Sequence, residues 1–454
     1  MICRLINDNN IKKVDLEIIS KDIIKPSNPT LQHLRNFSLS IIDQLMYDVY
    51  TPLIFFFPNT DKGSVKEVIT KRSKYLKETL SQILTQFYPL AGEIKDNSYI
   101  DCNDKGAYFV EARVNQMLED FIRQPDDHKV RELIPETPST TESSKGNYVM
   151  GIQVNIFSCG GIGLSTSFSH KIFDGQTYFM FMKAWAAAVR GSPEIISPSF
   201  VASEVFPKTH SLKYSLPSNL MTNEFLSTKR FVFDSTALAR LKSKPISGAT
   251  HGPTRMVATS AVIWKATVNT ASALRTFTPQ SPHALLSMVN IRKRASPPFA
   301  NESFGNIVDT ADAICFPNSQ PDLATLTREV RESLAKKDSN HIETMKGEKG
   351  HGTFNEILST LNHLTSVMDK RDFVFVSSLL NSGMYDLDFG WAKLIWFHYM
   401  NAGFTKTVSL HETLKGGGVE ARVTMSPDEM DIFECDPELL SYAMVDPSPL
   451  QFLR

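Results

Sequence analysis

The chain has 454 residues, of which 42% are hydrophobic and 21% charged, and its formal net charge is −1. Acidic and basic residues are interspersed, which argues against nucleic acid or an anionic membrane as a partner. No apolar run reaches transmembrane length and residues 1–10 lack the apolar region of a secretory leader, so a cytoplasmic protein is expected. The length predicts two domains of roughly 200 residues each.

The five cysteines are scattered along the chain as Cys3, Cys102, Cys159, Cys315 and Cys435. Their odd number and irregular spacing fit neither a disulfide framework nor a zinc site, and a reducing compartment suits them better. The histidines also lack the spacing of zinc ligands, so no bound metal is expected.

The first half of the chain predicts strands mixed with helices. Apolar runs predict strands at residues 14–24, 99–102, 107–112, 149–157 and 162–168. Helical spacing predicts helices at residues 64–87 and 177–189. The turn sequence at residues 103–106 predicts that the runs at 99–102 and 107–112 pair as a hairpin.

The pattern breaks down between Gly191 and Asn223, where prolines recur among serines. Such a stretch predicts an inter-domain linker at residues 191–223. The predicted N-terminal domain is therefore 1–190 and the predicted C-terminal domain 224–454.

The second half predicts the same mixture of elements. Strands are predicted at residues 230–233, 285–290, 407–410 and 419–425, and helices at 235–241 and 259–272. Asp234 and Ser235 can cap the first of these helices. The basic, glycine-containing run at 345–352 predicts a mobile loop, and Lys415-Gly416-Gly417-Gly418 predicts a hairpin turn. Mixed strands and helices favour layered α/β domains.

His170 stands where a predicted strand ends and a predicted helix has not yet begun. Such a junction exposes a side chain on a rigid support. A histidine there can take a proton from a hydroxyl or amine that attacks a carbonyl, and one base with oxyanion stabilisation suffices for a thioester. Taken alone, a lone histidine is more often a core residue that only satisfies a hydrogen bond.

The run His170-Lys171-Ile172-Phe173-Asp174-Gly175 does not stand alone. With Asp388-Phe389-Gly390-Trp391 more than two hundred residues later, it resembles the motif pair of the plant BAHD acyltransferases. The resemblance extends from residue 18 to about 433 and is closest to the alkaloid acetyltransferase branch. Shorter matching runs are Tyr88-Pro89-Leu90-Ala91-Gly92, Asp101-Cys102-Asn103-Asp104, Val289-Asn290-Ile291-Arg292 and Phe304-Gly305-Asn306.

The resemblance implies a role for each matching residue. His170 would be the base that deprotonates the acceptor in a ternary complex with acyl-CoA, without a covalent enzyme intermediate. Asp174 would turn away from the substrate and pair with Arg292, because a bidentate carboxylate–arginine pair can lock the turn that carries His170. Asp388 would lie away from the substrate and support the CoA-binding architecture.

The fold implied by the resemblance is α/β, with two similar domains of the chloramphenicol acetyltransferase type and a central solvent channel at their interface. Thr259, Ser260, Asn290 and Arg292 lie where the family contacts CoA. The implied co-substrate is acetyl-CoA or malonyl-CoA, with no permanently bound cofactor and no metal. The implied acceptor is a monoterpene indole or related alkaloid, acylated on oxygen or nitrogen, and the chain is expected to be a monomer.

The sequence departs from the family pattern near the second motif. Ala392 replaces the final glycine of that motif, which is tolerable only at an ordinary φ, and Leu394 replaces a proline. Upstream, Leu379-Leu380-Asn381 replaces a tryptophan-cysteine-arginine stretch, so CoA affinity is uncertain from the sequence. Lys415 and the lysines at 346–349 are expected to be solvated, with CoA phosphates as the alternative partner.

Arg422 stands where related sequences often carry an aromatic residue. Strand alternation places it on the side opposite Val419, Ala421 and Val423. If that side faces the channel, the guanidinium can bind the free carboxylate of a malonyl group, which favours malonyl-CoA as donor. The alternative is a solvated arginine that pairs with Glu420, and the sequence does not decide between them.

Three other interpretations remain open. A peptide-synthetase condensation domain shares the ancestral fold but doubles the first motif histidine, where this chain has Ser169. A serine hydrolase needs a covalent acyl-enzyme, but Ser165 lacks the closing glycine of a nucleophile elbow. A non-catalytic member of the same fold would bind acyl-CoA or an alkaloid without turnover, as the altered residue Ala392 allows.

Overall fold

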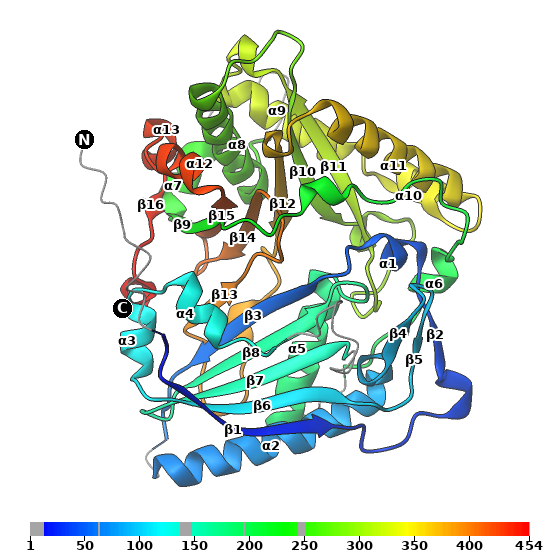
Figure 1. Cartoon of the computed structure of the whole chain (residues 1–454), viewed down its shortest axis with the longest axis vertical. Coiled ribbons are helices and arrows are strands. Elements are labelled where there is room, and N and C mark those ends of the chain that lie inside the picture. The colour runs from blue at the N-terminus through cyan, green and yellow to red at the C-terminus, as the bar shows by residue number, and fades with distance from the viewer. Residues whose placement is uncertain (1–12, 62–63, 137–147, 194–195, 244–250, 454) are drawn as a thin grey trace.

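The chain folds around two large mixed β-sheets, which lie one above the other in Figure 1 with helices on their faces. The computed structural model describes residues 13–61, 64–136, 148–193, 196–243 and 251–453. Each sheet has its own apolar core, so the predicted α/β class with two sheet-based domains is confirmed.

The first sheet has six strands, and only β6 and β7 run parallel. In spatial order they are β1 (Leu16–Ile24), β6 (Ala107–Val114), β7 (Met150–Phe157), β8 (Ile162–Ser169), β3 (Tyr50–Phe57) and β13 (Trp396–Tyr399). β7 and β8 are buried at every position. Both faces of these strands are therefore covered, which explains why most of their residues are apolar or small. The polar pair Gln153 and Asn155 in β7 is satisfied internally, since Gln153 Nε2 donates to Asn155 Oδ1 at 2.8 Å.

The second sheet has seven strands, and parallel pairs join β12 to both β10 and β14. In spatial order they are β11 (Val308–Cys315), β10 (His283–Asn290), β12 (Phe373–Ser378), β14 (Thr407–Glu412), β15 (Val419–Met425), β9 (Ser227–Phe233) and β16 (Met444–Val445). A small third sheet contains β2 (Asn36–Ser38), β5 (Tyr99–Asp101) and β4 (Glu93–Lys95).

Helices cover the sheets. The helices packed around the first sheet are α2 (Val65–Gln86), α3 (Leu118–Arg123), α4 (Asp127–Glu132) and α5 (Gly175–Val189). Those packed on the second are α7 (Ser235–Lys242), α8 (Arg255–Leu274), α9 (Leu323–Ala335), α11 (Gly350–Val367), α12 (Pro427–Phe433) and α13 (Pro437–Leu440). Shorter helices are α1 (Ile41–Leu45), α6 (Ala202–Val205) and α10 (Ser339–Met345). No helix among the described residues is long and apolar enough to cross a membrane.

Side-chain caps fix where the main helices begin. Ser64 caps α2, Asp174 caps α5 and Thr254 caps α8, each by accepting a hydrogen bond from a backbone N–H of the first turn. Asp234 caps α7 by accepting from the Ala237 N–H at 2.7 Å, as predicted. Such caps satisfy N–H groups that have no partner within the helix.

Two local predictions are wrong. Residues 99–101 and 107–114 are strands, but β5 pairs in the small sheet and β6 in the first large sheet, so they form no hairpin. Gly106, at φ +98°, redirects the chain between the two sheets. The predicted loop at 345–352 is also shorter than expected, because α10 extends to Met345 and α11 begins at Gly350.

The sheet topology adds a crossover that the predicted boundaries do not contain. β13 comes from the C-terminal half but pairs with β3 at the edge of the first sheet, from Trp396 opposite Phe56 to Tyr399 opposite Leu53. The predicted linker at 191–223 contains α6, and its Ser199 bridges to Ser303 of the C-terminal half. The C-terminal half therefore contributes one strand to the first sheet, in addition to the covalent connection through residues 191–223.

Candidate active site

His170 follows the last residue of β8, in the turn before α5. Its backbone N–H donates to the Val49 carbonyl at 2.8 Å, and the Asn306 side-chain Nδ2 donates to its carbonyl at 2.9 Å. The first contact comes from the segment before β3 and the second from the segment before β11. The backbone of His170 is therefore held from both halves of the molecule.

Asp174 and Arg292 form a buried bidentate ion pair below this turn. Arg292 Nη1 contacts Asp174 Oδ2 at 2.5 Å and Nη2 contacts Oδ1 at 3.1 Å, with the two side chains 1% and 5% exposed. Asp174 also accepts from the N–H groups of Thr177 and Ile307. The guanidinium lowers the pKa of Asp174 against the opposing effect of burial, so this carboxylate stays ionised and faces Arg292.

The run Phe304-Gly305-Asn306 builds the other side of this pair. Gly305, at φ +110°, turns the chain so that its carbonyl accepts from Arg292 Nη2 at 3.0 Å and from the Thr177 hydroxyl at 2.9 Å. Asn306 is fixed by Asp43, which accepts from both its backbone N–H and its Nδ2. The motif therefore holds the turn that carries His170 through the hydrogen bonds of Gly305 and Asn306.

Gly175, the first residue of α5, has a steric role. A Cβ at this position would lie 2.6 Å from Leu379 Cδ2. A larger residue after Asp174 would therefore push aside the end of the Leu379 side chain, which borders the smaller cavity.

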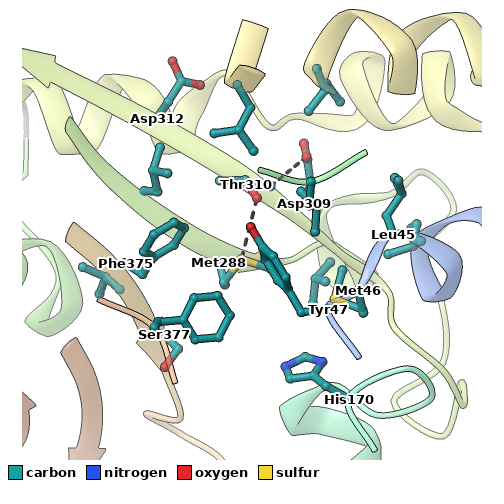
Figure 2. Close-up of a pocket in the computed structure, with 18 of the residues that line it drawn as sticks. Leu45, Met46, Tyr47, His170, Met288, Asp309, Thr310, Asp312, Phe375 and Ser377 are labelled. Carbon is teal, nitrogen blue, oxygen red and sulfur yellow. Dashed lines mark hydrogen bonds between the residues drawn. The ribbon is translucent and has the colours of Figure 1, made fainter. Parts of the chain in front are cut away.

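Two cavities meet at His170. The larger has a volume of about 370 Å³ and is lined mainly by apolar side chains. Figure 2 shows His170 at one end of this cavity and Asp309 and Asp312 at the other. Representative apolar lining residues are Leu45, Met46, Leu361, Phe375 and Phe404.

The smaller cavity, of about 240 Å³, lies on the other side of the same residues. It is bounded by the first turn of α5, by Asn290 and by residues 377–382. The residues that line both cavities are Thr51, His170, Met288, Val308, Ser377 and Tyr399. This arrangement is the central channel that the sequence resemblance implied.

Burial lowers the pKa of His170 below its usual value of 6.5, while Asp174 and the Asn306 side chain oppose this shift. The imidazole is therefore neutral at pH 7 and able to accept a proton. His170 Nδ1 and Asn306 Oδ1 are both buried, and neither atom has a hydrogen-bond partner among the described residues. The sequence marks Asn306 only as part of a short motif and predicts no site role for it, because nothing in the sequence places it beside the histidine.

Asp388 lies outside both cavities. Its Oδ1 accepts from the Gly390 N–H at 2.7 Å, and its carbonyl accepts from Arg190 at the end of α5. The neighbouring Phe389 packs edge-on against Phe57 and Trp185. Asp388 therefore shapes its own loop, at a place away from His170.

Of the residues predicted to contact CoA, one lines the smaller cavity and three do not. Asn290 lines the smaller cavity, as do Leu379, Leu380 and Asn381. Thr259 and Ser260 are fully buried in α8 and line neither of the cavities that contain His170. Arg292 likewise lines neither, because it is occupied by Asp174. Helical spacing predicted α8 but not which of its faces meets the sheet.

Ala392 has no positive φ, so the condition set for a methyl group at this position is met. Gly390 keeps the left-handed conformation at φ +86°. The loop that carries these residues is also held by Arg72, whose guanidinium lies 5.4 Å from the Trp391 ring centroid.

The position of Arg422 argues against the hypothesis that it binds the carboxylate of a malonyl donor. It lies on the predicted side of β15, but it is 2% exposed and lines neither cavity that contains His170. Its guanidinium donates to Glu420 Oε1 at 2.9 Å and to the Phe397 carbonyl at 3.3 Å, and it lies 2.7 Å from His398 Nδ1. The condition for binding a malonyl carboxylate is not met. The alternative partner, Glu420, is present, although the pair is buried and not solvated.

The described residues contain no group of three or more histidine, cysteine or carboxylate side chains able to hold a metal ion. Cys102, Cys159, Cys315 and Cys435 are free thiols. The chemistry available at the junction of the cavities is therefore that of an imidazole base surrounded by hydroxyl-bearing and apolar side chains.

Residues 14–440 match the family model described as Transferase family. The chain therefore belongs to this family, the BAHD acyl-CoA-dependent acyltransferases. It is 34% identical over 453 residues to epi-neemfruitin B 7-O-acetyltransferase of Melia azedarach, covering 96% of this chain and 99% of the relative. It is 32% identical to stemmadenine O-acetyltransferase of Catharanthus roseus, covering 93% and 96%.

The fold is similar to that of vinorine synthase, with a TM-score of 0.81 and 31% sequence identity over 96% of this chain and 99% of that one. Relatives of comparable length are named both for O-acetyl transfer and for N-malonyl transfer. The class of the enzyme is thus established, and acyl-CoA is its co-substrate. Donor and acceptor differ among its relatives.

Proposed function

We propose that this enzyme transfers an acetyl group from acetyl-CoA to a hydroxyl group of a rigid, mainly apolar plant metabolite, either a monoterpene indole alkaloid or a terpenoid of similar size. The observation that carries the proposal is the position of His170 where two cavities meet. A base at that point reaches an acceptor held in one cavity and a thioester held in the other.

The larger cavity suits the acceptor. Its volume of about 370 Å³ lies within the range of small-molecule sites, and its walls are mainly apolar with few polar groups. A polycyclic acceptor buries its carbon skeleton against Leu361 and Phe375, with the reacting hydroxyl directed toward His170. This orientation places other polar groups of the acceptor toward the end with Asp309 and Asp312.

The smaller cavity suits the pantetheine arm of CoA. It opens past Asn290 and residues 379–382, which include the segment where the sequence departs from the family pattern. No lysine or arginine is among the described residues that line it. A malonyl carboxylate therefore has no cation to pair with there, which favours the acetyl donor.

The catalytic steps depend on the neutral protonation state of the His170 imidazole. Neutral imidazole accepts the acceptor's hydroxyl proton at Nε2 while the oxygen attacks the thioester carbon. Asn306 is placed to accept from Nδ1–H, which holds the tautomer in which Nε2 is the base. The imidazolium then returns the proton to the departing CoA thiolate, so no acyl-enzyme forms.

A product screen tests the proposal. Purified enzyme is incubated with acetyl-CoA or malonyl-CoA and a panel of hydroxylated and amine-bearing alkaloids and limonoids, and products are identified by mass. The expected result is acetylated product from a hydroxylated acceptor, with no stable acyl adduct on the intact protein. A stable adduct overturns the mechanism. Acyl-CoA binding without product from any acceptor supports the non-catalytic interpretation instead.

A further inference from the structure

We propose that the hydroxyl groups of Thr51, Ser377 and Tyr399 form the oxyanion site of this enzyme, with Tyr399 as the principal donor. The inference rests on the proposed acetyl transfer, because it assigns the groups that stabilise the charge formed in that reaction.

Thr51, Ser377 and Tyr399 lie where the two cavities meet. The three residues come from β3, β12 and β13, and apart from His170 they are the polar residues that line both cavities. Figure 2 shows Ser377 at the same end of the larger cavity as His170. A carbon attacked from one cavity while bonded to a leaving group in the other must lie at this junction.

The hydroxyls of these three residues are available to a ligand. The hydroxyls of Thr51, Ser377 and Tyr399 make no hydrogen bond to any residue that the structure describes, and Thr51 Oγ1 is buried. The two other tyrosine hydroxyls beside these cavities are occupied, since Tyr47 donates to the Pro217 carbonyl at 2.9 Å and Tyr178 bonds to Thr166 at 2.7 Å. Thr51 Oγ1 is buried without a partner, and the hydroxyl-bearing residues Ser377 and Tyr399 are half-buried at the wall of both cavities, so all three hydroxyls are free to donate to a bound ligand.

Hydroxyl donors at this point can stabilise the negative charge that forms on the thioester oxygen. The acceptor oxygen forms a bond to the thioester carbon, the π pair of the carbonyl moves to its oxygen, and the acceptor proton passes to His170. The oxyanion then accepts hydrogen bonds from the hydroxyls. When the carbonyl re-forms, the C–S bond breaks and the thiolate takes the proton from His170. Each hydroxyl donates without losing its proton, so the step balances.

Tyr399 is the principal donor for two reasons. A phenol is a stronger hydrogen-bond donor than an alcohol, and burial raises the pKa of Tyr399 to about 12, so the proton stays on the oxygen at neutral pH. No lysine or arginine lines the space shared by the two cavities among the described residues. Neutral donors must therefore stabilise the charge there.

The alternative role for Tyr399 is to fill space, since its ring lies 6.0 Å from that of His411. Tyr399→Phe separates the two roles, because it keeps the ring and removes only the hydroxyl. Ser377→Ala has a matched control in Ser287→Ala. Ser287 is a buried serine whose hydroxyl, like that of the half-buried Ser377, has no described partner, but it lines neither cavity.

The experiment measures kcat, both KM values and Tm with acetyl-CoA and the acceptor found in the panel screen. We expect Tyr399→Phe to lower kcat by about 10²–10³-fold with KM values and Tm little changed, since oxyanion donors act mainly in the transition state. Ser377→Ala lowers kcat by a smaller factor, and Ser287→Ala leaves it within about twofold of wild type.

Two results overturn the proposal. One is Tyr399→Phe with kcat within about threefold of wild type while His170→Ala is inactive, which leaves the proposed function standing. The other is a kcat loss that follows Tm across all the variants, Ser287→Ala included. Full activity in His170→Ala contradicts the proposed function itself and is therefore distinguishable from both.

Discussion

Two buried arginines, Arg292 and Arg422, each hold a carboxylate in the interior, and only one of them touches the turn that carries His170. Arg292 pairs with Asp174 and also donates to the Ser303 and Gly305 carbonyls at 2.9 and 3.0 Å. Arg422 pairs with Glu420 and contacts His398 of β13. The first arginine joins the end of β10 to the start of α5, and the second joins the two large sheets.

The difference shows that a buried charge does not by itself mark a reactive site. Both arginines are nearly inaccessible, and burial is a principal influence on the ionisation of the groups around each of them. What separates them is the element to which each carboxylate belongs. Asp174 caps α5 four residues after His170, whereas Glu420 lies in β15 among side chains that line neither cavity of the channel.

The largest expected effect comes from breaking the first pair. Asp174→Ala leaves the Arg292 guanidinium buried without its partner, so we expect a loss of about 3–5 kcal/mol in the free energy of unfolding together with loss of transfer activity. Denaturant unfolding and the transfer rate of the same preparation measure both. Asp174→Asn should show the same effects in milder form.

The matched control is Glu17→Ala, because Glu17 pairs with Arg113 at 2.8 Å and the two side chains are 60% and 55% exposed. This substitution should cost less than about 1 kcal/mol, as for exposed ion pairs. If Asp174→Ala also costs less than about 1 kcal/mol, Arg292 does not hold the His170 turn as described.

A smaller effect is expected at the second arginine. Arg422→Leu leaves Glu420 with another cation, since Arg230 Nε lies 3.3 Å from Glu420 Oε1, so we expect a loss of about 1–3 kcal/mol in stability. The ratio of acetyl to malonyl transfer should not change. A shift of that ratio by tenfold or more would place Arg422 in donor recognition after all and would erase the distinction between the two arginines.

The pH dependence of activity should be smaller still over the neutral range. The base form of His170 is the neutral one, and its pKa is lowered below 6.5, so activity falls only as pH drops through that lowered pKa. Between pH 8 and pH 6.5, kcat/KM should therefore decline less than twofold. A midpoint at or above pH 7 would show that the nearby Asp174 carboxylate outweighs burial.

The smallest effect is expected at the altered motif. Ala392→Gly restores the family residue at a position with ordinary φ, so it should cost no more than about 1 kcal/mol through added chain freedom. The KM for acetyl-CoA should change less than about threefold. A tenfold fall in KM would show that Ala392 weakens CoA binding, as the sequence comparison allowed.

Regular patterns made much of the fold predictable from the sequence. β7 and β8 are continuous, mainly apolar runs and α5 has helical spacing, while the hairpin of β14 and β15 has Gly416 and Gly417 of its turn at φ +72°. β13 was missed because four residues carry little pattern and its partner strand lies more than three hundred residues earlier. The hairpin predicted at residues 99–112 was wrong because β5 and β6 are adjacent in the sequence but pair in different sheets.

The candidate site was predictable only where a motif marks it. The motif located His170 and its resemblance implied the Asp174–Arg292 contact seen in the structure. Strand alternation gave the correct side for Arg422 but could not show what covers that side. Thr51, Ser377 and Tyr399 could not be found in advance, since three unremarkable strand residues meet only when both sheets are in place.

The most direct test of the account is the acetyl-transfer rate of His170→Ala, measured with the acceptor identified by product mass and with Tm recorded on the same protein. We predict a fall in kcat of at least about 10²-fold, the scale of a positioned general base, with a folded protein and acetyl-CoA still bound. A variant that retains wild-type turnover would contradict the assignment of the base and, with it, the direct transfer between the two cavities.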